Sequence, residues 1–314
     1  MEYRLDPQAM ALLAQAKLQG ARPISSMPPE EARRAYRESR LPTQPPPRPV
    51  DSRRDFVVPG PGGLVPVREY RPAGSGKTAA LPALVFCHGG GWVVGDRDTH
   101  DVLCSELCDL AGCAVFSVDY RLAPEHRFPA AFDDALAVTQ WLAQHAQDLA
   151  IDAARMAVGG DSAGGNLAAA VALALRDTGD VRLVAQVLAY PVTDLRCGTR
   201  SYQDRGEGYV LTAADMQYFR GHYITEPAHY TDWRASPLLA ANHAGLPPAL
   251  VLTAGYDPLR DEGRFYADKL SAAGVVVQHV CFEGQMHGFL GMGKVIDEAN
   301  AAVQLCADWL RRYF

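Results

Sequence analysis

The sequence predicts an α/β protein built on an eight-stranded, mostly parallel sheet. Short apolar segments alternate with helical patterns along most of the chain, and the apolar segments carry hydrophobic residues at nearly every position. Strands of that kind are buried on both faces, which is typical of a parallel sheet covered by helices. A share of 48% hydrophobic and 21% charged residues agrees with such a globular protein.

An antiparallel pair of strands is expected to open the sheet. Residues 56–58 and 64–70 are extended patterns that flank a Pro-Gly-Pro-Gly-Gly turn, a typical hairpin signal. Six further strands are expected at residues 83–87, 114–118, 156–159, 181–188, 249–255 and 275–282. The helices between and after them are expected to begin near Thr99, Ala130, Ser162, Leu259 and Val295.

Two segments depart from this alternation. Residues 1–50 contain two short helical patterns, at 12–18 and 29–37, and then a stiff proline-rich connector. They are too few and too polar for a core of their own, so we predict an N-terminal arm on a main domain of residues 51–314. Residues 196–235 form an aromatic-rich insertion between two strands, which is usually a lid or cap over a site.

Charge and hydropathy exclude several classes of function. Thirty basic and 36 acidic residues give a net charge of −6, so no strong positive field attracts nucleic acid or anionic membranes. No apolar run approaches the roughly 18 residues that cross a bilayer. The first residues lack the basic and then apolar pattern of a secretory signal. We therefore expect a cytoplasmic protein with no nucleic-acid partner and no membrane span.

The cysteines predict neither a disulfide framework nor a metal centre. Their number, seven, is odd, and no C-x-x-C pair occurs. Cys104 and Cys108 stand four residues apart on a predicted helix, a spacing that suits a metal. Two thiols without further ligands nearby are better explained as one buried helix face. We expect neither a metal nor an organic cofactor.

The sequence Gly-Asp-Ser-Ala-Gly, centred on Ser162, is a G-x-S-x-G motif between a predicted strand and an alanine-rich helical pattern. That context is typical of a nucleophile elbow, a turn so tight that Gly160 and Gly164 must be small. The alternative is a glycine-rich turn whose serine only caps the helix.

A triple glycine at residues 89–91 follows the strand at 83–87. Its exposed backbone N–H groups are suited to bind an oxyanion together with the N–H of Ala163, the residue after the candidate nucleophile. A phosphate-binding loop is the alternative, but no G-x-G-x-x-G follows and the chain is acidic. We favour Gly90, Gly91 and Ala163 as donors and keep Gly89 as a further candidate.

A serine nucleophile needs a base held by an acid, and folds with such an elbow carry them in the order serine, acid, histidine. Of the downstream histidines, only His287 follows the last strand in a loop that could reach the carboxyl edge of the sheet. Asp257 follows the preceding strand and is the favoured acid. Asp261, Glu262 and Glu283 are the alternatives.

These motifs resemble those of the hormone-sensitive-lipase-like branch of the α/β-hydrolase superfamily, the bacterial family IV esterases. The family's HGGGW and GDSAGG motifs stand here at residues 88–92 and 160–165, and the resemblance covers roughly residues 50–314. It implies an α/β-hydrolase fold with a helical cap made of the N-terminal arm and the insertion. It also implies Ser162 as nucleophile, Asp257 as acid and His287 as base.

The resemblance implies a serine carboxylesterase that hydrolyses short-to-medium-chain esters through an acyl-enzyme. An amidase or a lactonase with the same triad is the alternative. A non-catalytic receptor on the same fold is disfavoured, because such receptors lack the histidine that stands here as His287.

Two further expectations concern the cap and the last strand. Five side chains could line a substrate pocket: Trp92, Tyr209, Leu211, Met216 and Phe219. For the last four, packing within the cap is an equally good explanation. The strand at 275–282 is an apolar sheet edge that could pair with itself across a two-fold axis, which would give a homodimer.

Overall fold

The computed structural model describes residues 4–76 and 80–314, so residues 1–3 of the predicted arm lie outside the described residues. An eight-stranded sheet forms the centre, in the order β1-β2-β4-β3-β5-β6-β7-β8. The strands are β1 (Val50–Gly60), β2 (Gly63–Pro72), β3 (Leu81–Cys87), β4 (Ala114–Val118), β5 (Ile151–Asp161), β6 (Leu183–Ala189), β7 (Ala249–Tyr256) and β8 (Val277–Met286).

The pairing confirms the predicted sheet. β1 and β2 form an antiparallel hairpin that closes with Gly60 opposite Gly63, and β2 is also antiparallel to β4. All pairs from β4 through β3 to β8 are parallel. The carboxyl ends of the parallel strands therefore meet at one edge of the sheet, where sites are built in such folds.

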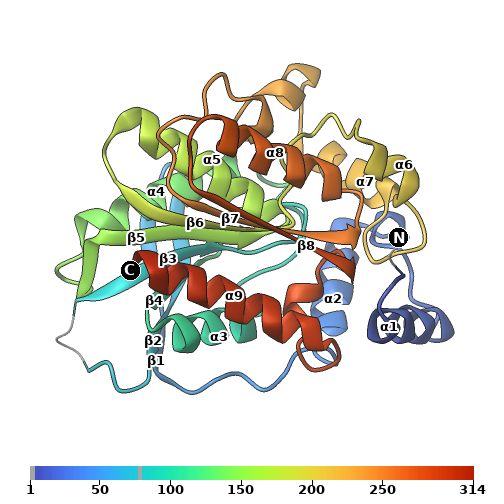
Figure 1. Ribbon diagram of the computed structural model, residues 1–314, viewed down its shortest axis with the longest axis horizontal. Helices are drawn as coiled ribbons and strands as arrows, with labels where there is room; N and C mark the ends of the chain where they lie inside the picture. The colour runs from blue at the N-terminus through green and yellow to red at the C-terminus, as the bar shows by residue number, and fades with distance from the viewer. Residues whose placement is uncertain (1–3, 77–79) are drawn as a thin grey trace.

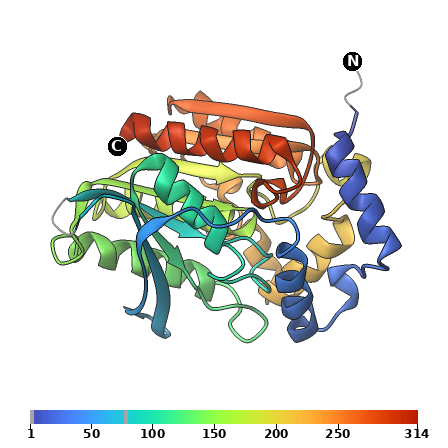
Figure 2. The same ribbon diagram turned by 90° about the horizontal axis from the view of Figure 1, so that it is seen from below.

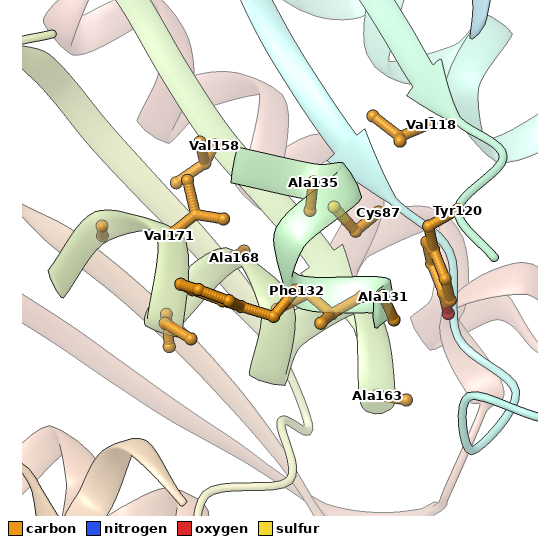
Figure 3. Close-up of a cluster of buried hydrophobic side chains, with 14 of the residues drawn as sticks. Cys87, Val118, Tyr120, Ala131, Phe132, Ala135, Val158, Ala163, Ala168 and Val171 are labelled. Atoms are coloured by element: carbon orange, nitrogen blue, oxygen red, sulfur yellow. The ribbon is translucent and has the colours of Figure 1, made fainter. Parts of the chain in front are cut away.

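Helices cover both faces of the sheet (Figure 1). One face carries α3 (Asp101–Ala111) and α9 (Asp297–Tyr313), and the other carries α4 (Ala130–Gln144), α5 (Ala163–Thr178) and α8 (Arg260–Ala272). Each face has its own buried core. Figure 3 shows part of the second core, where Phe132 of α4 lies beside the small side chains of α5.

The alanine-rich composition of α5 explains its central position. Every residue from Ala163 to Leu175 is buried, so the helix contacts the sheet and its neighbours all round. Small side chains allow that close approach. The strand β7, buried at all of its positions, lies under the same layer.

The predicted strand boundaries differ from the observed ones where the pattern is polar. β5 begins at Ile151 and not at residue 156. Residues 152–155 are polar or small and half-buried or exposed, so they did not fit the apolar pattern that predicted the strand. Ion pairing of Arg155 with Asp152 holds this part of the strand at the surface. β6 and β8 each begin two residues later than predicted, and β8 runs on to Met286.

The N-terminal arm and the insertion lie together at the carboxyl edge of the parallel strands (Figures 1 and 2). The arm contains α1 (Pro7–Leu18), η1 (Ile24–Ser26) and α2 (Pro29–Arg40), and the segment between β6 and β7 contains α6 (Arg200–Asp204), α7 (Ala213–Tyr223), η2 (Pro227–Thr231) and η3 (Pro237–Leu239). The Ser25 N–H donates to Asp215 Oδ1 over 3.0 Å. The other oxygen of Asp215 caps α7 through Thr212, so one buried carboxylate joins the two segments.

In residues 4–76 and 80–314, no helix is both long and apolar enough to cross a membrane. The same residues contain no group of three or more His, Cys, Asp or Glu side chains arranged to hold a metal ion. All seven cysteines are free thiols, and Cys104 and Cys108 are both buried on α3.

Candidate active site

Ser162 occupies the turn between β5 and α5 with a strained backbone. Its φ is +56° and its ψ is −119°, a conformation that costs a non-glycine residue about 1–3 kcal/mol. The turn is held because the Ser162 N–H donates to Ala189 O over 2.8 Å, and its carbonyl accepts from the N–H groups of Asn166 and Val192. The hydroxyl is therefore presented at the carboxyl edge of the sheet.

The two glycines of the motif are required by contacts with backbone. A Cβ added at Gly160 would lie 2.4 Å from the carbonyl carbon of Gly164, and one added at Gly164 would lie 1.9 Å from Cys87 O. Side chains cannot be accommodated at such distances. The sequence predicts small residues here, and the approach of the end of β3 is the physical reason.

His287 and Asp257 complete a hydrogen-bonded chain with Ser162. The distance from His287 Nε2 to Ser162 Oγ is 2.9 Å, and that from His287 Nδ1 to Asp257 Oδ2 is 2.6 Å. The Leu259 N–H donates to Asp257 Oδ1 over 2.9 Å, which orients the carboxylate. An Nδ1–H that faces Asp257 leaves Nε2 as an acceptor for the serine proton.

Two of the three alternative acids, Asp261 and Glu262, serve other parts of the structure. The carboxylate of Asp261 accepts the Ser201 N–H and so holds α6. Glu262 is fully buried and accepts the N–H groups of Thr193 and Asp194, while burial raises its pKa well above the usual range. The structure thus brings Asp257, and neither of these two side chains, to His287.

The glycine loop after β3 has the geometry of an anion-binding turn. Gly90 and Gly91 have φ values of +123° and +58°. A Cβ at Gly90 would lie 2.1 Å from Val94 O, and one at Gly91 would lie 2.2 Å from the ring of Phe219. Within the described part of the chain, the N–H groups of Gly90, Gly91 and Ala163 have no hydrogen-bond acceptor, so they are free to bind a ligand oxygen.

Gly89 must be removed from the predicted donors. Its N–H already donates to Asp161 Oδ1 over 2.8 Å. Asp161 Oδ1 also lies 3.1 Å from His100 Nε2. Burial raises the pKa of Asp161, but His100, Arg40 and the Gly89 N–H together outweigh burial and lower it to about 2. Asp161 is thus an ionised anchor for the glycine loop.

His88 also shapes this loop. Its Nδ1 lies 2.9 Å from Gly89 O, and its ring stacks on Tyr120 with a centroid distance of 4.2 Å. The Tyr120 hydroxyl donates to His88 O. Burial lowers the pKa of His88 to about 4, so the ring is neutral at pH 7 and organises the turn.

The predicted pocket residues fall into two groups. Phe219 lies directly against Gly91, and Leu211, Met216 and Phe219 are all buried in the segment between β6 and β7. The prediction that Trp92 lines a pocket is wrong, because its ring has no exposed surface. The ring stacks on that of Tyr223, with 4.4 Å between the centroids. It packs the loop and lines no accessible pocket.

Tyr209 and a further tyrosine stand apart from that group. The ring of Tyr209 packs on Tyr256, with 5.1 Å between centroids. Tyr190, which the sequence prediction missed, has its ring 4.7 Å from the His287 ring. Its position two residues after a predicted strand, at the same edge of the sheet, is the available signal.

The comparisons with known proteins agree with this geometry. A family model described as alpha/beta hydrolase fold matches residues 84–291. The chain belongs to this family. It is 44% identical to the carboxylic ester hydrolase LipN of Mycobacterium tuberculosis over 92% of this chain and 77% of LipN. It is 42% identical to the ethyl acetate hydrolase of Pseudomonas putida over 93% and 92% of the respective chains.

Solved structures of family members superpose closely. An ester hydrolase from the metagenome of Lake Arreo, complexed with a derivative of bipyridine phosphonate, has a TM-score of 0.94 at 41% identity, covering 99% of each chain. An esterase of Pyrobaculum calidifontis has a TM-score of 0.91 at 38% identity, again over 99% of each chain. The predicted fold and the predicted enzyme class, a carboxylic ester hydrolase, are confirmed.

Proposed function

We propose that this hydrolase is a serine carboxylesterase of the hormone-sensitive-lipase-like branch, acting on short-to-medium-chain carboxylic esters. The observation that carries the proposal is the chain from Ser162 Oγ through His287 to Asp257, with distances of 2.9 and 2.6 Å. It stands next to three backbone N–H groups that have no acceptor in the part of the chain that the structure describes. This is the arrangement that acyl transfer requires.

In the first half of the reaction, Ser162 Oγ attacks the ester carbonyl carbon while its proton passes to His287 Nε2. The carbonyl oxygen becomes an oxyanion that accepts hydrogen bonds from Gly90, Gly91 and Ala163. Asp257 stabilises the imidazolium cation and holds its orientation. The carbon–oxygen bond to the alcohol then breaks, and the alcohol leaves with the proton from His287.

In the second half, His287 takes a proton from a water molecule, which attacks the acyl-enzyme carbonyl carbon. The second tetrahedral intermediate uses the same three N–H donors. It collapses with breakage of the bond to Ser162 Oγ, which regains its proton from His287. The carboxylic acid product leaves, and the net reaction consumes one ester and one water.

Esters are favoured over amides and lactones by the similar proteins, among them an ethyl acetate hydrolase. All three reactions share the acyl-enzyme and differ in the leaving group. A non-catalytic receptor is the weaker candidate, because His287 makes both hydrogen bonds of a working base.

The N-terminal arm and the insertion between β6 and β7 form the cap in this proposal. Support comes from their joint position at the carboxyl edge and from the Ser25–Asp215 contact. Ser162 and His287 are each only 8% exposed, so a substrate enters beneath this cover. Phe219, which touches Gly91, is the side chain best placed to contact the acyl group.

A panel of p-nitrophenyl esters, matching anilides and lactones tests the proposal. We expect the highest kcat/KM for esters of short to medium acyl chains, and anilides slower by at least an order of magnitude. If Phe219 limits the acyl pocket, Phe219→Ala shifts the chain-length optimum upward while the acetate rate stays close to wild type. A faster anilide than ester would sink the ester assignment, and an unchanged optimum would remove Phe219 from the pocket.

We also propose a homodimer through β8. This strand is the last in the sheet order, and most of its residues are only half-buried. In the described residues the arm bonds to this edge at Gly284, and the remainder of such an edge invites pairing with a second copy. Sedimentation equilibrium should report twice the monomer mass, and Cys281→Pro in β8, whose N–H points away from β7, should give a monomer. A wild-type monomer at micromolar concentration would contradict this proposal.

The proposed compartment is the cytoplasm. All seven cysteines are free thiols, five of them buried, as is typical of proteins that fold in a reducing environment. Unchanged melting temperatures with and without a thiol reductant would agree with this, whereas a drop on reduction would contradict it.

A further inference from the structure

The N-terminal arm contacts both sides of the segment that carries His287. On the side that precedes the histidine, the Asp6 N–H donates to Gly284 O over 2.9 Å. On the side that follows it, Arg40 Nη1 approaches Gly288 O at 3.5 Å. The loop therefore rests on the arm at both ends, although the arm is far away in sequence.

Arg40, the last residue of α2, is a buried cation at this contact. Its side chain is only 7% exposed, and its Nη2 donates to the Tyr36 hydroxyl over 2.8 Å. A Cβ added at Gly291 would lie 3.5 Å from Arg40 Nη1, so the guanidinium packs against the loop. Its Nε has no partner among the described residues. A buried cation with so few hydrogen-bond partners costs folding free energy, which points to a functional role for Arg40 at this position.

The charge of Arg40 acts on two residues that adjoin the triad, Asp161 and Tyr190. It is among the groups that keep the pKa of Asp161, the neighbour of the nucleophile, at about 2 against the effect of burial. Burial raises the pKa of Tyr190, and Arg40 acts against that rise. The ring of Tyr190 contacts His287. The charge of Arg40 thus acts on a neighbour of Ser162 and on a neighbour of His287, in addition to its contact with the histidine loop.

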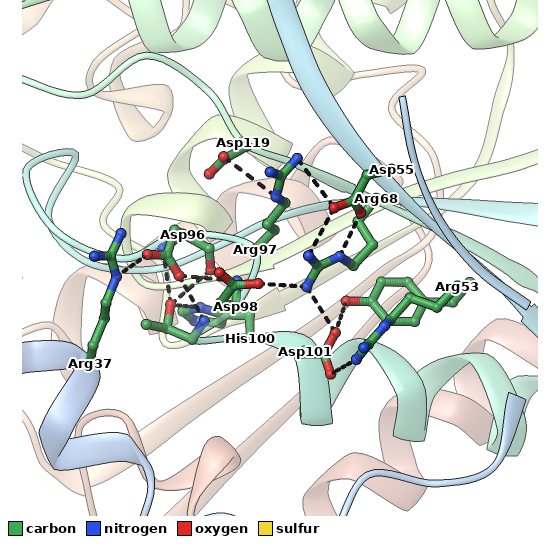
Figure 4. A network of polar contacts seen from close by, with 12 residues as sticks. Arg37, Arg53, Asp55, Arg68, Asp96, Arg97, Asp98, His100, Asp101 and Asp119 are labelled. Carbon is green, nitrogen blue, oxygen red and sulfur yellow. Dashed lines mark hydrogen bonds and ion pairs between the residues drawn. The ribbon is translucent and has the colours of Figure 1, made fainter. Parts of the chain in front are cut away.

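The same helix also holds the glycine loop. Arg33 Nε donates to Val93 O over 2.8 Å, and Arg33 Nη2 donates to Ala123 O over 2.9 Å. Arg37 pairs with Asp96, the start of a polar network that continues to His100 (Figure 4).

A surface cavity of about 450 Å³ is bordered by Arg33 and Arg37 of α2 and, on its other side, by Gly95, Asp96 and Tyr120. The arginines attach α2 beside this cavity, in addition to the packing of its buried Ala32. Arginines at 33, 37 and 40 follow helical spacing and share one face of α2. The helix α2 therefore contacts the segment just after the glycine loop through Arg33, and the loop that carries His287 through Arg40.

We propose that Arg40 is a positioning residue for His287, through which α2 fixes the histidine loop relative to the glycine loop. The proposal rests on the proposed triad, because it concerns the placement of the base. Arg40 touches neither Ser162 nor the donors, so it acts on the rate only through the loop that it holds.

The test compares Arg40→Met with Arg34→Met, a change at an exposed arginine of the same helix. We expect Arg40→Met to lower kcat on p-nitrophenyl acetate about tenfold, since small displacements of a base reduce the rate steeply. KM should stay within about twofold. The same factor should hold for the butyrate and hexanoate esters, because no substrate contact is lost. Arg34→Met should behave as wild type.

Arg40→Lys keeps the cation without the planar fork and should recover part of the rate, leaving a loss of about threefold. It also decides the question if Arg40→Met does not fold. Wild-type kcat in a folded Arg40→Met or in Arg40→Lys would overturn the proposal, as would a raised KM with unchanged kcat. An inactive Ser162→Ala beside a fully active Arg40→Met would refute the positioning role alone, whereas an active Ser162→Ala would refute the triad itself.

Discussion

Replacement of Ser162 by alanine is expected to lower kcat on p-nitrophenyl butyrate by about 10⁶-fold. The hydroxyl is the only group within hydrogen-bond distance of His287 Nε2 in the described residues, so no other nucleophile can take its place. Loss of a serine nucleophile removes nearly all of the rate enhancement, and only the small part that comes from the oxyanion donors and substrate binding remains. KM should change little, because the pocket is untouched.

The fold should survive this change. Alanine at position 162 leaves in place the glycines that the turn requires. The backbone hydrogen bonds of residue 162 with Ala189, Asn166 and Val192 involve no side-chain oxygen, so they are also kept. Circular dichroism and the melting temperature should therefore match wild type.

A covalent probe makes the Ser162 test independent of turnover. A p-nitrophenyl alkylphosphonate should release one p-nitrophenolate per chain from the wild type and add one phosphonyl group to the peptide with Ser162. The Ser162→Ala protein should release none. Ser271→Ala, at an exposed serine of α8, is the matched control and should react as wild type. Turnover by Ser162→Ala above one per cent of wild type would rule out Ser162 as nucleophile.

Sequence patterns predicted the parts of this site that local geometry dictates. The turn at Ser162 is one of them, because contacts of the order of 2 Å at Gly160 and Gly164 leave no choice of side chain. The order serine, acid, histidine follows from the order of the strands in the sheet. Asp257 and His287 could therefore be predicted from their places after the last two strands.

Contacts between segments distant in sequence could not be predicted in this way. The Gly89 N–H is engaged by Asp161, 72 residues later in the chain, and no local pattern reports that pairing. Trp92 belongs to the glycine motif, yet it stacks on Tyr223 of α7. Arg40 lies in a polar helix whose sequence gives no sign that its last residue is buried.

His287→Ala should reduce kcat about as much as Ser162→Ala, by about 10⁶-fold, because the two residues act as one unit. Without the imidazole, the Ser162 hydroxyl keeps its proton and Asp257 has no partner to orient. The control is His126→Ala, at an exposed histidine of the loop after β4, which should retain most of the activity.

The His287 variant also permits a rescue that no merely structural residue would show. Removal of the imidazole leaves room beside Ser162, so millimolar imidazole in solution should restore part of the rate in proportion to its concentration. The same imidazole should not affect Ser162→Ala, since that variant lacks the nucleophile to be activated. Equal losses in His287→Ala and His126→Ala would show that the base has been assigned wrongly. Because rescue requires both a vacant base position and an intact nucleophile, it separates the role of His287 from any effect on folding.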